Sequence, residues 1–134
     1  MLTLRKAEIS VEFVVFIGIL LIFFVFFIGI LGAKTRDTNE STVFTNAQSI
    51  ADKIADEINI AARFGGYYRE FYIPQRLVNG DDYSVTFYLN FRLVEVKWDG
   101  KNAMSNLVTE NISGNISLGN NKIRNENGVI IIEG

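Results

Sequence analysis

Hydrophobic and polar positions follow three different patterns in succession along the chain. Residues Phe13 to Ala33 are apolar and uncharged, and about 20 such residues suffice to cross a bilayer as one helix. The large side chains in this run surround the expected helix, which indicates a helix embedded in lipid or in the centre of an assembly. The first pattern therefore predicts a membrane-spanning or core helix.

The second pattern is that of an amphipathic helix, in which apolar residues recur at steps of three and four. Its apolar positions are Val43, Ala47, Ile50, Ala51, Ile54, Ala55, Ile58 and Ala62. Its expected polar face carries Asn46, Lys53, Asp56, Glu57 and Arg63. Gly65-Gly66 is a strong stop signal, so we expect the helix to end at Phe64.

The polar segment from Lys34 to Thr42 connects these two helices. It contains neither Pro nor Gly, which favours one continuous helix from Glu8 to Phe64. The alternative is a hinge in this segment, with Ser41 or Thr42 capping a separate second helix.

The third pattern, from Tyr67 onward, is typical of β-strands. Tyr67 to Ile73 is rich in β-favouring residues and is followed by Pro74. Apolar residues occupy odd positions from Tyr83 to Phe91 but even positions from Val94 to Trp98. We therefore expect a turn or bulge near Asn90 to Arg92 between two antiparallel strands. Shorter candidate strands follow at residues 103–108, 112–118 and 129–132. Together these patterns predict an α+β fold, with a small antiparallel sheet or sandwich packed against the amphipathic helix.

Composition excludes several classes of function. The 134 residues carry a net charge of −2 and contain neither His nor Cys, which removes the commonest general base, the thiol nucleophile and most transition-metal ligand sets. The chain has no basic block that would neutralise a nucleic acid backbone. We therefore expect no enzyme, no cofactor, no metal site and no nucleic acid partner. A membrane-bound enzyme would require two acidic side chains that converge in the folded head.

The residues before the apolar run combine a positive flank with one carboxylate. Arg5 and Lys6 predict a cytoplasmic N-terminus and an external location for most of the chain. Glu12 stands at the mouth of the run, where ionised groups are costly and usually functional. It is either solvated at the interface, catalytic, or paired with a positive group of a neighbouring subunit.

The order of these residues resembles the N-terminus of archaeal type IV pilin precursors, which carry class III signal peptides. In that family the short basic leader ends in Lys or Arg and a small residue, as Lys6-Ala7 do here. Ser10 and Glu12 match the third and fifth positions of mature pilins, while Glu8 stands where the family usually has Gln. The resemblance implies that a prepilin peptidase cleaves between Ala7 and Glu8, and that Glu12 neutralises the α-amino group of Glu8 on an adjacent subunit.

The same resemblance implies a structural subunit of a surface filament that serves adhesion. Membrane lipid would hold the subunit in the cytoplasmic membrane, and an assembly ATPase with its membrane platform would add it to a helical polymer of identical or related pilins. The implied divisions are a cleaved leader (1–7), a hydrophobic core helix (8–33), an amphipathic stalk helix (34–64) and an extracellular β head (65–134). The alternative is a single-pass signal-anchor protein whose outer β domain binds a partner or a glycan and never polymerises.

Three Asn-x-Ser sequons make N-glycosylation a further expectation; they begin at Asn39, Asn111 and Asn115. The last two fall in the expected head, where acceptor sites are exposed. A glycan on Asn39 would crowd a packed helical core, so modification is expected less at this position.

Overall fold

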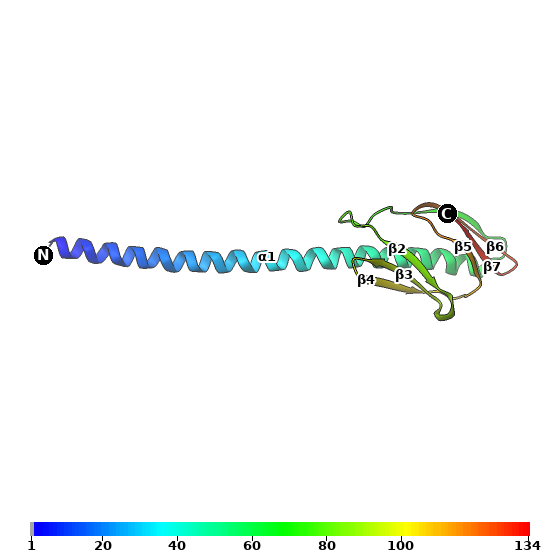
Figure 1. Cartoon of the computed structure of the whole chain (residues 1–134), viewed down its shortest axis with the longest axis horizontal. Coiled ribbons are helices and arrows are strands. Elements are labelled where there is room, and N and C mark those ends of the chain that lie inside the picture. The colour runs from blue at the N-terminus through cyan, green and yellow to red at the C-terminus, as the bar shows by residue number, and fades with distance from the viewer. Residues whose placement is uncertain (1) are drawn as a thin grey trace. The chain divides into compact units, whose positions relative to one another are not determined.

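A computed structural model describes the backbone of residues 2–134 and the side chains of residues 10–34 and 39–134. The chain divides into two compact units, Met1–Glu40 and Ser41–Gly134, here called the N-terminal unit and the head. The helix α1 (Leu2–Arg63) contributes to both units (Figure 1). Its backbone is helical through residues 34–42.

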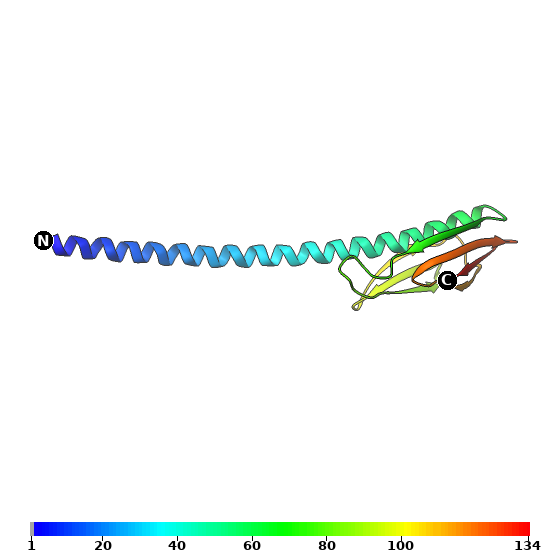
Figure 2. The same cartoon turned by 90° about the horizontal axis from the view of Figure 1, so that it is seen from above.

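The head, described in full, combines the C-terminal part of α1 with seven strands. They are β1 (Tyr68–Ile73), β2 (Ser84–Tyr88), β3 (Leu93–Trp98), β4 (Lys101–Asn106), β5 (Ile112–Asn115), β6 (Gly119–Glu126) and β7 (Val129–Glu133). One sheet has the strand order β1-β6-β7-β5 and the other has the order β2-β3-β4. Both lie on one side of the head's helical segment (Figure 2), which confirms the α+β fold.

The four-stranded sheet is mixed, whereas the sequence led us to expect an antiparallel one. β6 pairs antiparallel with both β1 and β7. β5 joins the sheet at the outer edge of β7, and there it runs parallel to β7.

The turn expected near Asn90 to Arg92, between two antiparallel strands, is confirmed. A short 3₁₀ helix, η1 (Leu89–Phe91), ends at Arg92 in the left-handed conformation, with φ 53° and ψ 51°. The chain then returns as β3, which pairs antiparallel with β2. The second hairpin turn, Asp99-Gly100, joins β3 to β4 and has positive φ at both residues, as a two-residue type I′ turn requires.

One strand, β6, was not among those expected from the sequence. Its inward positions are Gly119, Asn121, Ile123 and Asn125, all buried. With one apolar residue among four, the alternation that marks a half-buried strand is missing. The buried amides satisfy nearby backbone groups instead, so β6 packs inward without an apolar face.

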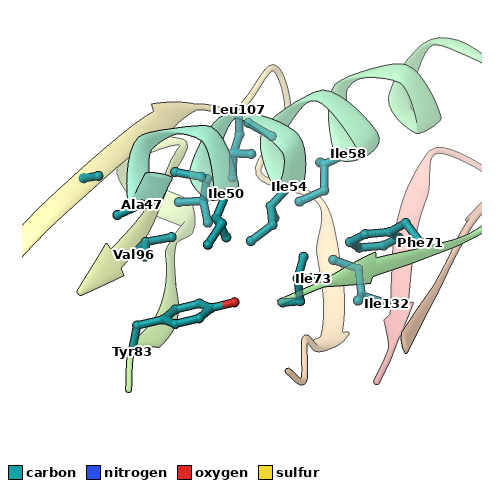
Figure 3. Packing of buried hydrophobic residues seen from close by; sticks show 14 of the residues in the cluster. Ala47, Ile50, Ile54, Ile58, Phe71, Ile73, Tyr83, Val96, Leu107 and Ile132 are labelled. Atoms are coloured by element: carbon teal, nitrogen blue, oxygen red, sulfur yellow. The ribbon is translucent and has the colours of Figure 1, made fainter. Parts of the chain in front are cut away.

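A single hydrophobic core joins α1 to both sheets in the head. Ile54 and Ile58 point from the helix toward Ile73 and Phe71 of β1 (Figure 3). The apolar helix positions expected from Val43 to Ile58 are all buried, while at the helix end Ala61 is buried and Ala62 is partly buried. Burying such side chains stabilises a fold by roughly 1.5–3 kcal/mol for each large one.

Candidate assembly interface

The expected processing site lies in a part of the chain whose side chains are not described. Lys6, Ala7 and Glu8 belong to the helical backbone of α1, but their side chains lie outside the described residues. Cleavage between Ala7 and Glu8 stays a prediction.

Ser10 and Glu12 are both exposed on α1. The two residues beside Glu12, Val11 and Phe13, are 64% and 63% exposed. One turn further along the helix lie Val15 and Phe16, which are also apolar and exposed, so the described side of the carboxylate is apolar. An ionised group among them requires water or a counter-charge from outside that helix.

An unbroken apolar surface follows Glu12. Every large apolar side chain from Val11 to Leu31 is between 42% and 69% exposed within the chain. A Cβ added at Gly18, Gly29 or Gly32 would meet nothing within 4 Å, so packing within the chain does not require glycine there. This part of α1 is long and apolar enough to cross a membrane, and an N-terminal signal sequence meets the same criterion. So large an apolar surface is unfavourable in water, so either lipid or neighbouring helices must cover it.

The three sequon asparagines are all exposed. Asn39 lies on α1, and Asn111 precedes β5, where its carbonyl accepts a hydrogen bond from Ile130 N at 2.9 Å. Asn115 ends β5, opposite Glu133 of β7. These positions permit glycan attachment, which stays a prediction.

Polar side chains on the flanks of α1 bind the edges of both sheets, a feature that sequence reasoning missed. Lys53 Nζ donates to Tyr72 O of β1 at 2.7 Å. On the other flank, Gln48 Nε2 donates to Met104 O of β4 at 2.9 Å, and Asn59 Nδ2 donates to Asn106 O at 3.1 Å. Since β1 and β4 are edge strands, the helix closes one edge of each sheet. Helical spacing places these residues beside the apolar stripe, but their partners appear only in the folded head.

Glu57 corrects the expected polar face, because it is 7% exposed and not solvated. Its carboxylate accepts a hydrogen bond from the Tyr67 hydroxyl at 3.4 Å and lies 3.3 Å from the Arg69 guanidinium. A second buried carboxylate, Glu95 on β3, accepts hydrogen bonds from Tyr88 and Asn102. The hydrogen bond to Glu95 raises the pKa of Tyr88.

Tyr83 is the most strongly perturbed titratable group that the structure describes. It is buried in the core, and its hydroxyl donates to Pro74 O. Burial, with a smaller contribution from Tyr72, raises its pKa to about 12. Because burial favours the neutral phenol, the Tyr83 side chain stays uncharged and packs as part of the core.

Among the residues whose side chains are described, no three His, Cys, Asp or Glu groups gather where they could hold a metal ion. No protein-family model, curated protein or solved structure matches the chain. The order of parts in the chain, a long apolar N-terminal helix followed by a β head, is pilin-like.

Proposed function

We propose that this chain is the structural subunit of an archaeal type IV pilus-like surface filament that serves adhesion, with a structural and not a catalytic role. A prepilin peptidase would remove residues 1–7. The new N-terminus would begin at Glu8, and the subunit would stay in the cytoplasmic membrane until an assembly ATPase and its platform add it to the polymer.

One observation carries the proposal: the apolar side chains from Phe13 to Leu31 are exposed all around the helix and follow a single carboxylate, Glu12. Both lipid and a bundle of neighbouring helices would cover such a surface. A helix has its backbone hydrogen bonds satisfied internally, so exchanging lipid for protein neighbours would break none of them.

Glu12 gives this exchange its selectivity. A charged side chain costs about 2.5–3.5 kcal/mol at the centre of a bilayer on insertion scales, and less near the edge. When Glu12 is buried among neighbouring helices, the free-energy cost of its charge rises again unless a positive group lies beside it. The α-amino group of Glu8 on an adjacent subunit would supply it, so a correctly placed neighbour is favoured over a misplaced one.

The test compares cells that produce the wild-type chain, Glu12→Ala, or Glu110→Ala as a control in an exposed loop of the head. We expect sheared extracellular filaments from the wild type and the control, with an N-terminal peptide that starts at Glu8. Glu12→Ala should reach the membrane in normal amount while its filament yield falls at least tenfold.

A full-length chain that starts at Met1 or Leu2 and occurs only in membranes would refute the proposal. That outcome would favour the single-pass anchor with a binding head. Wild-type filament yield from Glu12→Ala would refute the charge pairing alone.

A further inference from the structure

Two of the four sheet edges in the head are not closed by α1. The helix side chains described above bind β1 and β4, whereas the other two edge strands, β2 and β5, line one open groove of about 530 Å³. Its exposed lining is mainly polar and includes Thr86 of β2 and Asn115 of β5. Within the head, which the structure describes in full, no strand pairs with these two edges.

The open edges also lack charge. β1 contains Arg69 and Glu70, and β4 contains Lys101, whereas β2 and β5 contain no charged residue. Charged side chains and covering elements commonly protect a sheet edge against pairing with another chain. β2 and β5 have neither protection.

The backbone of β5 offers groups for such pairing. The carbonyl of Asn111 accepts a hydrogen bond from Ile130 N of β7 at 2.9 Å, and successive residues of a strand point their backbone groups to opposite edges. Gly114 lies an odd number of residues further along, so its N–H and carbonyl point to the open edge. This residue is exposed and has no side chain that would shield these groups.

Both sequons of the head lie at this open edge. Asn111 directly precedes β5 and Asn115 is its last residue, so the two acceptors are about 13 Å apart along the strand. Both asparagines are exposed, and neither side chain makes a hydrogen bond within the head. By contrast, Nδ2 of Asn59 and Nδ2 of Asn125 each donate to a backbone carbonyl. The Nδ2 atoms at the open edge are therefore available to carry a glycan.

We propose that N-glycans on Asn111 and Asn115 cover the open β2 and β5 edges and keep other chains from pairing with them. Each glycan forms when the asparagine Nδ2 bonds to the anomeric carbon of a sugar from an activated glycosyl phosphate donor. The bond from that carbon to the phosphate oxygen breaks, the phosphate leaves, and the nitrogen loses one proton.

The chemistry of a glycan suits this position. It is bulky and solubilising, so it is compatible with a groove whose lining is mainly polar, and it obstructs the approach of another strand. The inference rests on the export of the head in the proposed function, and it gives the glycans a position and a task.

Occupancy is tested by mass spectrometry of the peptides that carry Asn111 and Asn115. The full chain is taken from the membrane fraction of the cells that produce it. We expect a glycan on both asparagines in most copies. Unmodified peptides in this fraction would overturn the inference whether or not filaments form, and a failure to form filaments alone would refute only the proposed function.

Substitution tests the task of the glycans. In detergent micelles, the chain with Asn111→Gln and Asn115→Gln should form at least tenfold more large oligomers than the wild type, measured by sedimentation. Asn39→Gln removes the sequon outside the head and should leave that amount unchanged. In the oligomers, amide hydrogen exchange of Gly114 should slow at least tenfold, because its N–H then pairs with another chain. Oligomers in which Gly114 exchanges at the wild-type rate, or in which β6 amides lose their protection, would overturn the inference.

A charge at the edge separates edge protection from general solubility. Ser113→Lys on β5, added to the double variant, should restore the wild-type amount of oligomers, because lysine is a common protection of edge strands. Ser49→Lys, at an exposed position of α1, is the matched control and should restore nothing. Equal effects of the two lysines, whether both restore solubility or neither does, would overturn the assignment to the edge.

Discussion

Asn125 joins the end of α1 to the β6–β7 hairpin, and its removal should destabilise the head. The side chain is 5% exposed. Its Nδ2 donates to Ala61 O at 2.8 Å, and its Oδ1 accepts from Gly128 N at 2.9 Å. One buried amide therefore satisfies a carbonyl in the last turn of the helix, where intrahelical partners run out, and an N–H in a tight turn.

The magnitude follows from the groups left behind. An unsatisfied buried polar group costs about 1–3 kcal/mol. Phe64 N also approaches Ala61 O, at 3.4 Å, so that carbonyl keeps a weak partner after Asn125→Ala. We expect the substitution to lower the free energy of unfolding by about 2–4 kcal/mol. The control is Asn120→Ala at an exposed position of the same strand, with an expected change within about 0.5 kcal/mol.

Trp98 supplies the assay, because it is the single tryptophan of the chain and is 4% exposed in the core of the head. Its fluorescence during denaturant unfolding of the full chain in detergent micelles reports on the head. A free energy of unfolding for Asn125→Ala within 0.5 kcal/mol of the wild type would refute the reasoning, on the scale of ordinary surface substitutions.

Asn125→Asp separates hydrogen bonding from packing, because the side chain keeps its shape. An ionised carboxylate would face Ala61 O, an acceptor, so the folded state favours the protonated form and raises the pKa above the usual value of about 3.9. The group's contribution to stability is then present below pH 4 and is lost as the pH rises through the folded pKa. We expect the deficit relative to the wild type, measured at each pH, to be smaller at pH 4 than at pH 7; a deficit independent of pH would contradict the assignment of Nδ2 as the donor.

Two further predictions concern the core and the edge of the head. Gly114 in β5 has φ +94°, and a Cβ there would lie 2.0 Å from Ile132 O. Gly114→Ala should therefore break the β5–β7 pairing and increase the rate of amide hydrogen exchange in β5 at least tenfold. Amides of β5 that stay protected in the variant would contradict this prediction. Tyr83 has its pKa raised by burial to about 12, so this contribution to stability is complete below pH 10 and is lost as the pH rises through about 12. In ultraviolet titration Tyr83→Phe should remove a late phenolate transition, and loss of an early one would show that Tyr83 is accessible.

The parts of the head that the sequence predicts are those in which burial and apolarity coincide. The helix stripe ending at Ile58 and the change of phase between Phe87 and Val94 were both found from spacing alone. β6 was missed because Asn121 and Asn125 occupy inward positions. Their partners are backbone groups distant in sequence or in irregular turns, and periodicity carries no information about these.

The candidate interface divides in the same way. Glu12 and the apolar run are visible in the sequence because neighbouring residues define them. A groove lined by residues of β2 and β5 lies between two edge strands, and the strand order of both sheets, which periodicity does not give, decides which strands are edges. Glu57 was expected on the solvated face of the helix, but its carboxylate is buried and is bound by Tyr67 and Arg69. Both partners lie beyond the helix, so helical spacing does not reveal them.

The two units differ in where their stability comes from, and this difference bears on assembly. The head has its own core and closes two sheet edges with α1, so it can keep its fold while its surroundings change. The large apolar side chains described in the N-terminal unit, Val11 to Leu31, are 42–69% exposed within the chain and depend on what surrounds them. Because lipid tails and apolar side chains are similar as solvents, helices associate in membranes mainly through packing and polar contacts. In the proposed filament, selection of the correct neighbour would therefore come from a feature that distinguishes one environment from another, the charge of Glu12 at the start of the apolar run.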